Sequence, residues 1–169
     1  MRPARHLLAL LTLLVLVLPA GPASTQAPPK APQIPGITAK DAFPRGCVDC
    51  HVATPEGDMR LSTMLTAWKQ AVDADLLAKA QAAAPAGAKL RGKHLTATES
   101  LANIPDGCSV KCHKADSKLA PPMAEMVHVI HLTGGAQNVF LTKFQGQCTH
   151  CHKLDAKGKW TVPSAPEKK

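Results

Sequence analysis

All six cysteines of this 169-residue chain fall into three short stretches, and each stretch ends in Cys-His. The outer two run from Cys47 to His51 and from Cys148 to His152, with two residues between the cysteines. The middle one runs from Cys108 to His113 and has three intervening residues. With 8 histidines in 169 residues, composition alone would place one behind all three pairs roughly once in ten thousand chains. The pattern therefore needs a chemistry that uses two thiols and one imidazole each time.

Covalent haem attachment has that requirement. Two thiols separated by two residues can each add to one vinyl group of a haem, and the histidine that follows can bind its iron. The sequence thus predicts three c-type haems. The thiols are Cys47, Cys50, Cys108, Cys112, Cys148 and Cys151, and the proximal ligands are His51, His113 and His152.

Zinc and disulfides are the rival interpretations of the cysteines. A zinc ribbon pairs its cysteine knuckles about 15 to 20 residues apart, whereas 57 and 35 residues separate the motifs here. Three local disulfides suit an exported chain but give no reason for the histidines. Haem attachment is therefore the favoured interpretation, and the other two stay open.

The additional residue in the middle motif must form a bulge. A bulge would rotate one thiol relative to the other or displace His113. We expect a haem there with altered local geometry. The alternatives are a haem held by one thioether or no haem at all.

The second axial position of each iron decides function, because an open position admits substrate. Beyond the predicted signal peptide, three histidines remain outside the motifs for three haems: His94, His128 and His131. His128 and His131 are three residues apart on a predicted helix, so they share a face and can serve two different haems. The sequence therefore predicts bis-histidine iron throughout.

Other side chains compete for these roles. His150 lies inside the third motif, where its neighbours point it away from its own iron. The competing thioether ligands are Met59, Met64, Met123 and Met126. Methionine at helical spacing more often fills a core. Trp68 is expected to pack against a helix or a haem edge.

The rest of the composition fits a cofactor-filled protein. The chain has no tyrosine, 3 phenylalanines and 2 tryptophans, and such a thin core needs additional support. The net charge is +8, and removing a signal with Arg2 and Arg5 leaves 18 basic against 12 acidic residues, or +6. Acidic haem propionates would offset much of that excess. The remaining lysines favour an acidic redox partner over nucleic acid.

The N-terminus is typical of an exported protein. Two arginines precede an apolar run from Leu7 to Leu18, and small residues follow at Ala20 to Ala23. That run is too short for a membrane anchor but suits a signal peptide. We expect a signal peptide over residues 1–23 and a Pro/Ala-rich tether over 24–40. A tri-haem domain over 41–160 and a flexible basic tail over 161–169 follow. The mature protein should be soluble and periplasmic or otherwise exported, without a transmembrane anchor.

Apolar spacing predicts a mostly α-helical fold with extensive loops and little or no sheet. The longest predicted helix runs from Met59 to about Ala84, after a turn at 55–58 with Asp58 as a possible N-cap. A short helix is expected around 98–103. Pro121 and Pro122 introduce another at 123–132, which ends at Gly134. Beyond His152 the chain is expected to fray.

The three motifs and the His128-Val129-Ile130-His131 segment resemble multihaem c-type cytochromes, most closely class III cytochromes and their small tri-haem relatives. The resemblance implies a small, haem-filled shell of few helices in which paired distal histidines serve different haems. This chain departs from the family in its middle motif, in the paired histidines following the second motif, and in the long predicted helix after His51.

Three functions follow as hypotheses. The first is a non-enzymatic electron carrier with three covalent haems. The second is a small multihaem reductase with one open iron, for which the middle motif and His94 decide. The third is an exported zinc or disulfide module that acts as a binding protein.

Overall fold

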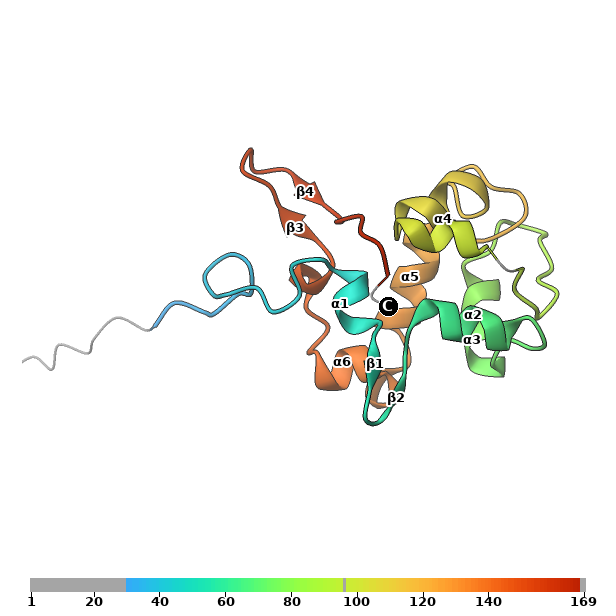
Figure 1. The fold of residues 1–169 in the computed structure, drawn as a ribbon, viewed down its shortest axis with the longest axis horizontal. Helices are drawn as coiled ribbons and strands as arrows, with labels where there is room; N and C mark the ends of the chain where they lie inside the picture. Colours follow the sequence, from blue (N-terminus) through green and yellow to red (C-terminus); the bar gives the residue numbers. More distant parts are fainter. Residues whose placement is uncertain (1–29, 96, 168–169) are drawn as a thin grey trace, which may run out of the picture. The chain divides into compact units, whose positions relative to one another are not determined.

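The structure, a computed structural model, describes residues 30–95 and 97–167. Residues from Pro32 onward form one unit (Figure 1). The predicted signal peptide over 1–23 and residues 24–29 of the predicted tether lie outside the described residues. The described part of the tether contains a turn, in which the amides of Thr38 and Ala39 donate to the carbonyl of Ile34.

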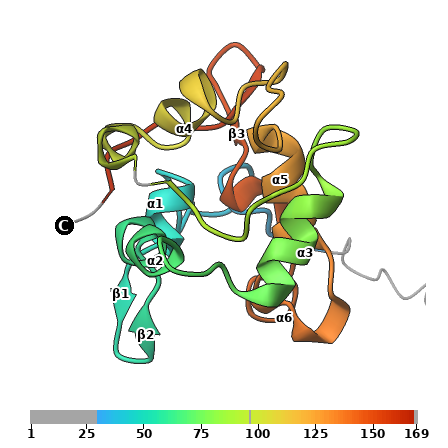
Figure 2. The ribbon, with the colours of Figure 1, turned by 90° about the vertical axis from the view of Figure 1, so that its right-hand side faces the viewer.

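Helix α5 (Met123–Leu132) has the bounds that its sequence predicts. Pro122 precedes it in an extended conformation, and the helix ends at Thr133, followed by Gly134 at a φ of 95°. A positive φ at Gly134 costs little because glycine has no Cβ. The helix packs against α3 (Ala74–Ala82) and α6 (Val139–Lys143), as Figure 2 shows for α3. Both His128 and His131 belong to this helix.

The long helix predicted over 59–84 is wrong, because the chain forms two helices there. Helix α2 (Leu61–Trp68) ends before Lys69, and α3 starts after Asp73. The Asp73 carboxylate accepts from the amides of two first-turn residues of α3, which favours a helix start over a helix interior. In the break, Val72 donates its amide to the carbonyl of Gly92 at 2.8 Å. A long-range contact therefore overrides a local apolar period.

The middle motif lies on α4 (Asp106–Lys111), which packs against the 3₁₀ turn η1 (Thr98–Ala102). That turn confirms the short helix predicted around 98–103. A Cβ atom added at Gly107 would overlap the carbonyl of Ser100, so only glycine permits this approach. The glycine next to Cys108 thus fixes where the middle motif starts.

Two further short helices lead into the third motif. The 3₁₀ turn η2 (Gly135–Gln137) follows α5, and Asn138 then caps α6. The side chain of Asn138 accepts from the amides of Phe140 and Leu141 and donates to the carbonyls of Ile130 and Thr133. One buried side chain therefore joins the end of α5 to the start of α6.

Over residues 30–95 and 97–167, strand is limited to two small antiparallel hairpins, which agrees with a mostly α-helical fold. Strands β1 (Ala53–Thr54) and β2 (Gly57–Asp58) pair around the turn expected at 55–58. Strands β3 (Lys153–Leu154) and β4 (Trp160–Thr161) pair in the C-terminal segment. A salt bridge of 2.9 Å between Lys153 and Asp41 joins that hairpin to the N-terminal side of the unit.

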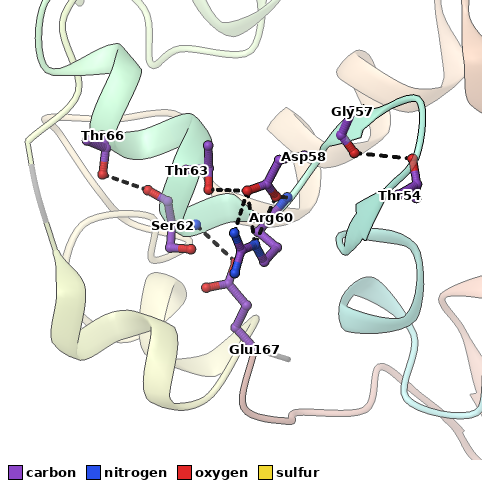
Figure 3. A network of polar contacts seen from close by, with 8 residues as sticks. All are labelled: Thr54, Gly57, Asp58, Arg60, Ser62, Thr63, Thr66 and Glu167. Carbon is purple, nitrogen blue, oxygen red and sulfur yellow. Dashed lines mark hydrogen bonds and ion pairs between the residues drawn. The ribbon is translucent and has the colours of Figure 1, made fainter. Parts of the chain in front are cut away.

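The prediction that the chain frays beyond His152 is wrong for the described residues up to 167. Ile104 and Ala165 exchange two backbone hydrogen bonds of 2.9 Å. The Glu167 carboxylate accepts from the amide of Ser62 at 3.0 Å, close to the network at the start of α2 (Figure 3). These contacts involve residues far apart in sequence, which a local pattern does not reveal.

Asp58 does not cap α2, because the N-cap position belongs to Arg60. The Asp58 carboxylate instead accepts from the Arg60 guanidinium and, at 2.8 Å, from the hydroxyl of Thr63 (Figure 3). It thus supports the first turn of the helix from the side.

The apolar core of the described residues is very small. Its buried apolar side chains are Val48, Ala83 and Ile104. Many large apolar side chains are exposed instead, among them Leu95 at 84% and Val110 at 70%. A chain of this length without a larger core needs other sources of stability. In the described ranges, no helix has the length and apolar content required to cross a bilayer.

Candidate haem centres

The outer motifs are single tight turns. The first forms α1 (Cys47–Cys50) and the third forms η3 (Cys148–His150). In both, the amide of the histidine donates to the carbonyl of the first cysteine, at 2.9 Å for His51 and 2.8 Å for His152. A turn closed over four residues places both cysteines and the histidine around one short axis.

The middle motif absorbs its extra residue without losing that contact. The amide of His113 donates to the carbonyl of Cys108 at 3.1 Å, over five residues instead of four. This is the wider hydrogen-bonded turn of a π-bulge, which inserts one residue into a helix. The predicted bulge is therefore present, and the amide of His113 still returns to the first cysteine of its motif.

Each motif histidine faces one histidine from elsewhere in the chain. The ring centroids of His51 and His131 are 6.2 Å apart, and the rings lie 83° from parallel. His113 faces His94 at 6.1 Å and 13°. His152 faces His128 at 5.9 Å and 33°. The structure therefore brings all six candidate axial ligands together as three pairs.

This spacing fits an iron atom between the two rings of each pair. An imidazole nitrogen binds a metal at about 2 Å and the ring centre lies about 1.2 Å further back, so opposed ligands have centroids about 6 Å apart. The three observed distances agree with that value. Among residues 30–95 and 97–167, no three or more His, Cys, Asp or Glu side chains gather where they could hold one metal ion.

Backbone carbonyls orient four of the six rings. The Nδ1 atoms of His51 and His131 lie 2.9 Å from the carbonyls of Met59 and Val127. The other two contacts are at 2.6 Å and 2.7 Å, from His94 to Leu95 and from His113 to Pro121. A carbonyl only accepts, so each Nδ1 carries the proton and each Nε2 keeps a free lone pair. Histidines that bind metals are usually held by this kind of contact.

The end of α2, where the predicted long helix breaks, positions His94. The amide of His94 donates to the carbonyl of Trp68, the last residue of α2, at 2.8 Å. The indole of Trp68 also lies against the imidazole, with centroids 6.2 Å apart. From the sequence we expect Trp68 to pack against a helix or a haem edge, and the ring contact found is with the imidazole of His94.

Burial shifts the pKa values of several candidate ligands and thiols. Burial lowers the pKa values of His51 and His94, so both rings are neutral at pH 7 and can donate a lone pair. Burial raises the pKa values of Cys47, Cys50 and Cys108, and it raises that of Cys151 to about 11. All six cysteines are free in the structure. The thiols of Cys47, Cys50, Cys108 and Cys151 are thus protonated at pH 7, whereas zinc binds the thiolate.

An apolar cavity of about 380 Å³ joins the three motifs. Its lining includes Cys47 of the first motif, His113 of the middle one and Cys148 of the third, together with His128 and His131 of α5. The three candidate centres therefore adjoin one shared space.

The competing candidates lie differently. His150 is buried, and its ring packs edge-to-face on Phe43 at 4.6 Å, with Phe140 and Phe144 nearby. It belongs to none of the three pairs. Met123 lines the cavity, and Met59 contributes a backbone carbonyl to His51.

Sequence reasoning missed the carbonyls of Met59, Leu95, Pro121 and Val127. Backbone groups carry no residue signature, so the sequence held no signal for three of them. Only Val127 could have been found, since it precedes His131 by four residues on one helix. Comparison with protein-family models, curated proteins and solved structures finds no match to this chain.

Proposed function

We propose that this protein is an exported electron carrier with three covalently attached c-type haems, each bound by two histidines. The pairing of every motif histidine with one further histidine, at 5.9 to 6.2 Å, carries the proposal. Proximal and distal ligands are then His51 with His131, His113 with His94, and His152 with His128. This pairing extends the sequence interpretation, which left the assignment open.

The electron-carrier function follows from the number of axial ligands on each iron. With an imidazole on both sides of each iron, no coordination position is left for a substrate. Electrons would then enter and leave through exposed haem edges, and the chain's contribution is to fix spacing, ligation and shielding. The reductase alternative needs an open middle site, and the close approach of His94 to His113 counts against it.

The small core supports the same proposal. Haem is a large apolar group, and three of them would supply the volume that the apolar side chains lack. Of the exposed apolar side chains, Leu95 follows His94 and Val110 lies within the middle motif. A haem bound there would cover apolar surface that is otherwise costly to expose.

Charge favours a partner of opposite sign. The chain remains basic after loss of the predicted signal peptide, and an acidic redox protein would be steered toward it. We propose the periplasm as the compartment because motifs for covalent haem attachment and the N-terminal signal pattern occur together.

The test is the intact mass of the protein expressed with haem-maturation machinery, beside its alkaline pyridine spectrum. A mass increase of three haems is expected, and two haems in a Cys108→Ala/Cys112→Ala variant. Low-spin spectra that carbon monoxide leaves unchanged would support full histidine ligation. A colourless product would refute the proposal, and carbon monoxide binding to the native reduced protein would favour the reductase.

A further inference from the structure

The three histidine pairs have nearly equal spacing but different ring orientations. The rings of His51 and His131 are crossed at 83°, whereas those of His94 and His113 are almost parallel at 13°. The pair of His128 and His152 is intermediate at 33°. Ligand type and distance are the same in all three, so the angle distinguishes the centres.

Specific contacts hold the crossed pair. His131 donates from Nδ1 to the Val127 carbonyl of its own helix, and His51 donates to the Met59 carbonyl after β2. Phe140 of α6 packs on the His131 ring with centroids 5.5 Å apart and planes at 90°. A rotation of the His131 ring away from this orientation would disturb both its hydrogen bond to Val127 and its contact with Phe140.

The parallel pair is held by separate elements. His94 donates to the Leu95 carbonyl and His113 to the Pro121 carbonyl. Trp68 lies against His94 on the side of α2. Neither ring contacts the aromatic cluster of Phe43, Phe140, Phe144 and His150, so the two orientations are set independently.

The angle matters because imidazole donates π electrons from an orbital perpendicular to its ring. Iron has two d orbitals that can accept these electrons. Two parallel rings donate into the same one and raise its energy well above that of the other. Two crossed rings raise one orbital each, so the two stay close in energy. Ferric iron then gains less by leaving one orbital half-filled, and the reduced state is relatively favoured. Ligand geometry is thus a means of setting a haem's potential, beside ligand identity and burial.

We propose that the chain makes its three haems unequal through these angles, and that the crossed pair of His51 and His131 defines the centre reduced first. Phe140 is a positioning residue that keeps the rings crossed. The inference rests on the proposed function. The step is a one-electron reduction of ferric to ferrous iron by an external one-electron donor, with no bond made or broken and no proton moved.

The first test is electron paramagnetic resonance of the oxidised holoprotein, which needs no variant. Near-degenerate iron orbitals give a low-spin signal with a very large g-maximum, and split orbitals give an ordinary rhombic signal. We expect one signal of the first kind, lost in His131→Ala, and one clearly rhombic signal, lost in His94→Ala. In a stepwise titration with dithionite, the large g-maximum signal should disappear first.

The second test addresses Phe140. In Phe140→Leu the large g-maximum should move toward the rhombic range, and that centre should be reduced later in the titration, with the other two signals unchanged. Phe43→Leu is the matched control, since Phe43 lies in the same aromatic cluster but contacts neither ring of the pair. Equal effects of both variants would overturn the positioning role.

The outcomes separate this inference from the proposed function. Three attached low-spin haems without a large g-maximum signal would overturn the inference and leave the electron carrier intact. A rhombic signal that disappears first would overturn the order of reduction. A protein without covalent haem would overturn the proposed function itself.

Discussion

Replacing Asn138 tests whether one side chain holds the end of α5, and with it His131. Asn138 is 7% exposed and makes four hydrogen bonds through its side chain. Two of them cap α6 and two satisfy the carbonyls of Ile130 and Thr133. In Asn138→Ala these groups lose their partner in a site that water reaches poorly.

The magnitude follows from the contacts. Loss of an N-cap costs about 1 kcal/mol, and each lost bond to a part-buried carbonyl costs about 1 kcal/mol. The free energy of unfolding should therefore fall by about 3 kcal/mol in Asn138→Ala. Asn138→Ser keeps a capping oxygen but does not reach the carbonyls, so it should lose about 2 kcal/mol.

The assay is guanidinium unfolding of the holoprotein, followed by circular dichroism and by the low-spin haem absorption. Covalent attachment would keep the haem on the unfolded chain, so its absorption reports the distal ligands throughout. Asn103→Ala is the control, because that side chain is exposed and should change stability by less than about 0.5 kcal/mol. A loss below about 1 kcal/mol in Asn138→Ala, or equal losses in the Ala and Ser variants, would refute this reasoning.

Three other predictions concern the haem centres and their support. His131→Ala should convert one haem to high spin without loss of covalent attachment, and an unchanged low-spin spectrum would exclude His131 as a ligand. Gly107→Ala should lower the guanidinium unfolding midpoint of the holoprotein, because its Cβ meets the backbone of η1, whereas Gly57→Ala should be tolerated since nothing lies within 4 Å; equal midpoints in the two variants would contradict the close approach. Burial would raise the pKa of Asp41, but the hydrogen bond and charge of Lys153 together with the hydrogen bond from the Phe43 amide outweigh it and lower that pKa below its usual 3.8. Ionised Asp41 therefore stabilises the folded state fully above pH 3.8, and this stabilisation is lost as the pH falls through the lowered pKa. The stability difference between the native protein and Asp41→Asn should be full at neutral pH and vanish in acid, and a pH-independent difference in guanidinium titrations would contradict the ion pair.

Features with a local physical cause were predictable from the sequence. The bounds of α5 follow from two prolines before it and two glycines after it, together with ten residues of helical composition. The mostly α-helical class follows from the same spacing. The pairing of His128 and His131 with different motif histidines also follows locally, because residues three apart share one helix face.

Features that depend on distant contacts were not predictable. The apolar period from Met59 to Ala84 is helical throughout, yet a bond from Val72 to Gly92 accompanies the break in the helix. The same holds for the C-terminal segment, which pairs with Ile104 from 61 residues away. The π-type turn at the middle motif was expected only as a bulge, because sequence spacing does not say which hydrogen bond survives an insertion.

The two kinds of ligand in the proposed carrier also differ in what they require of the fold. Each motif is a turn closed by one backbone hydrogen bond over four or five residues, so the thiols and the proximal histidine need no contact with distant residues to come together. The distal histidines lie 80, 19 and 24 residues from their partners, and only the docked α5 and the segment beside α2 bring them near. Bringing such distant groups together costs chain entropy that packing must offset. Attachment would thus precede folding, and distal ligation would report its completion. Because α5 supplies two of the three distal ligands, two haems should change spin state together when this helix undocks, and the third should change separately.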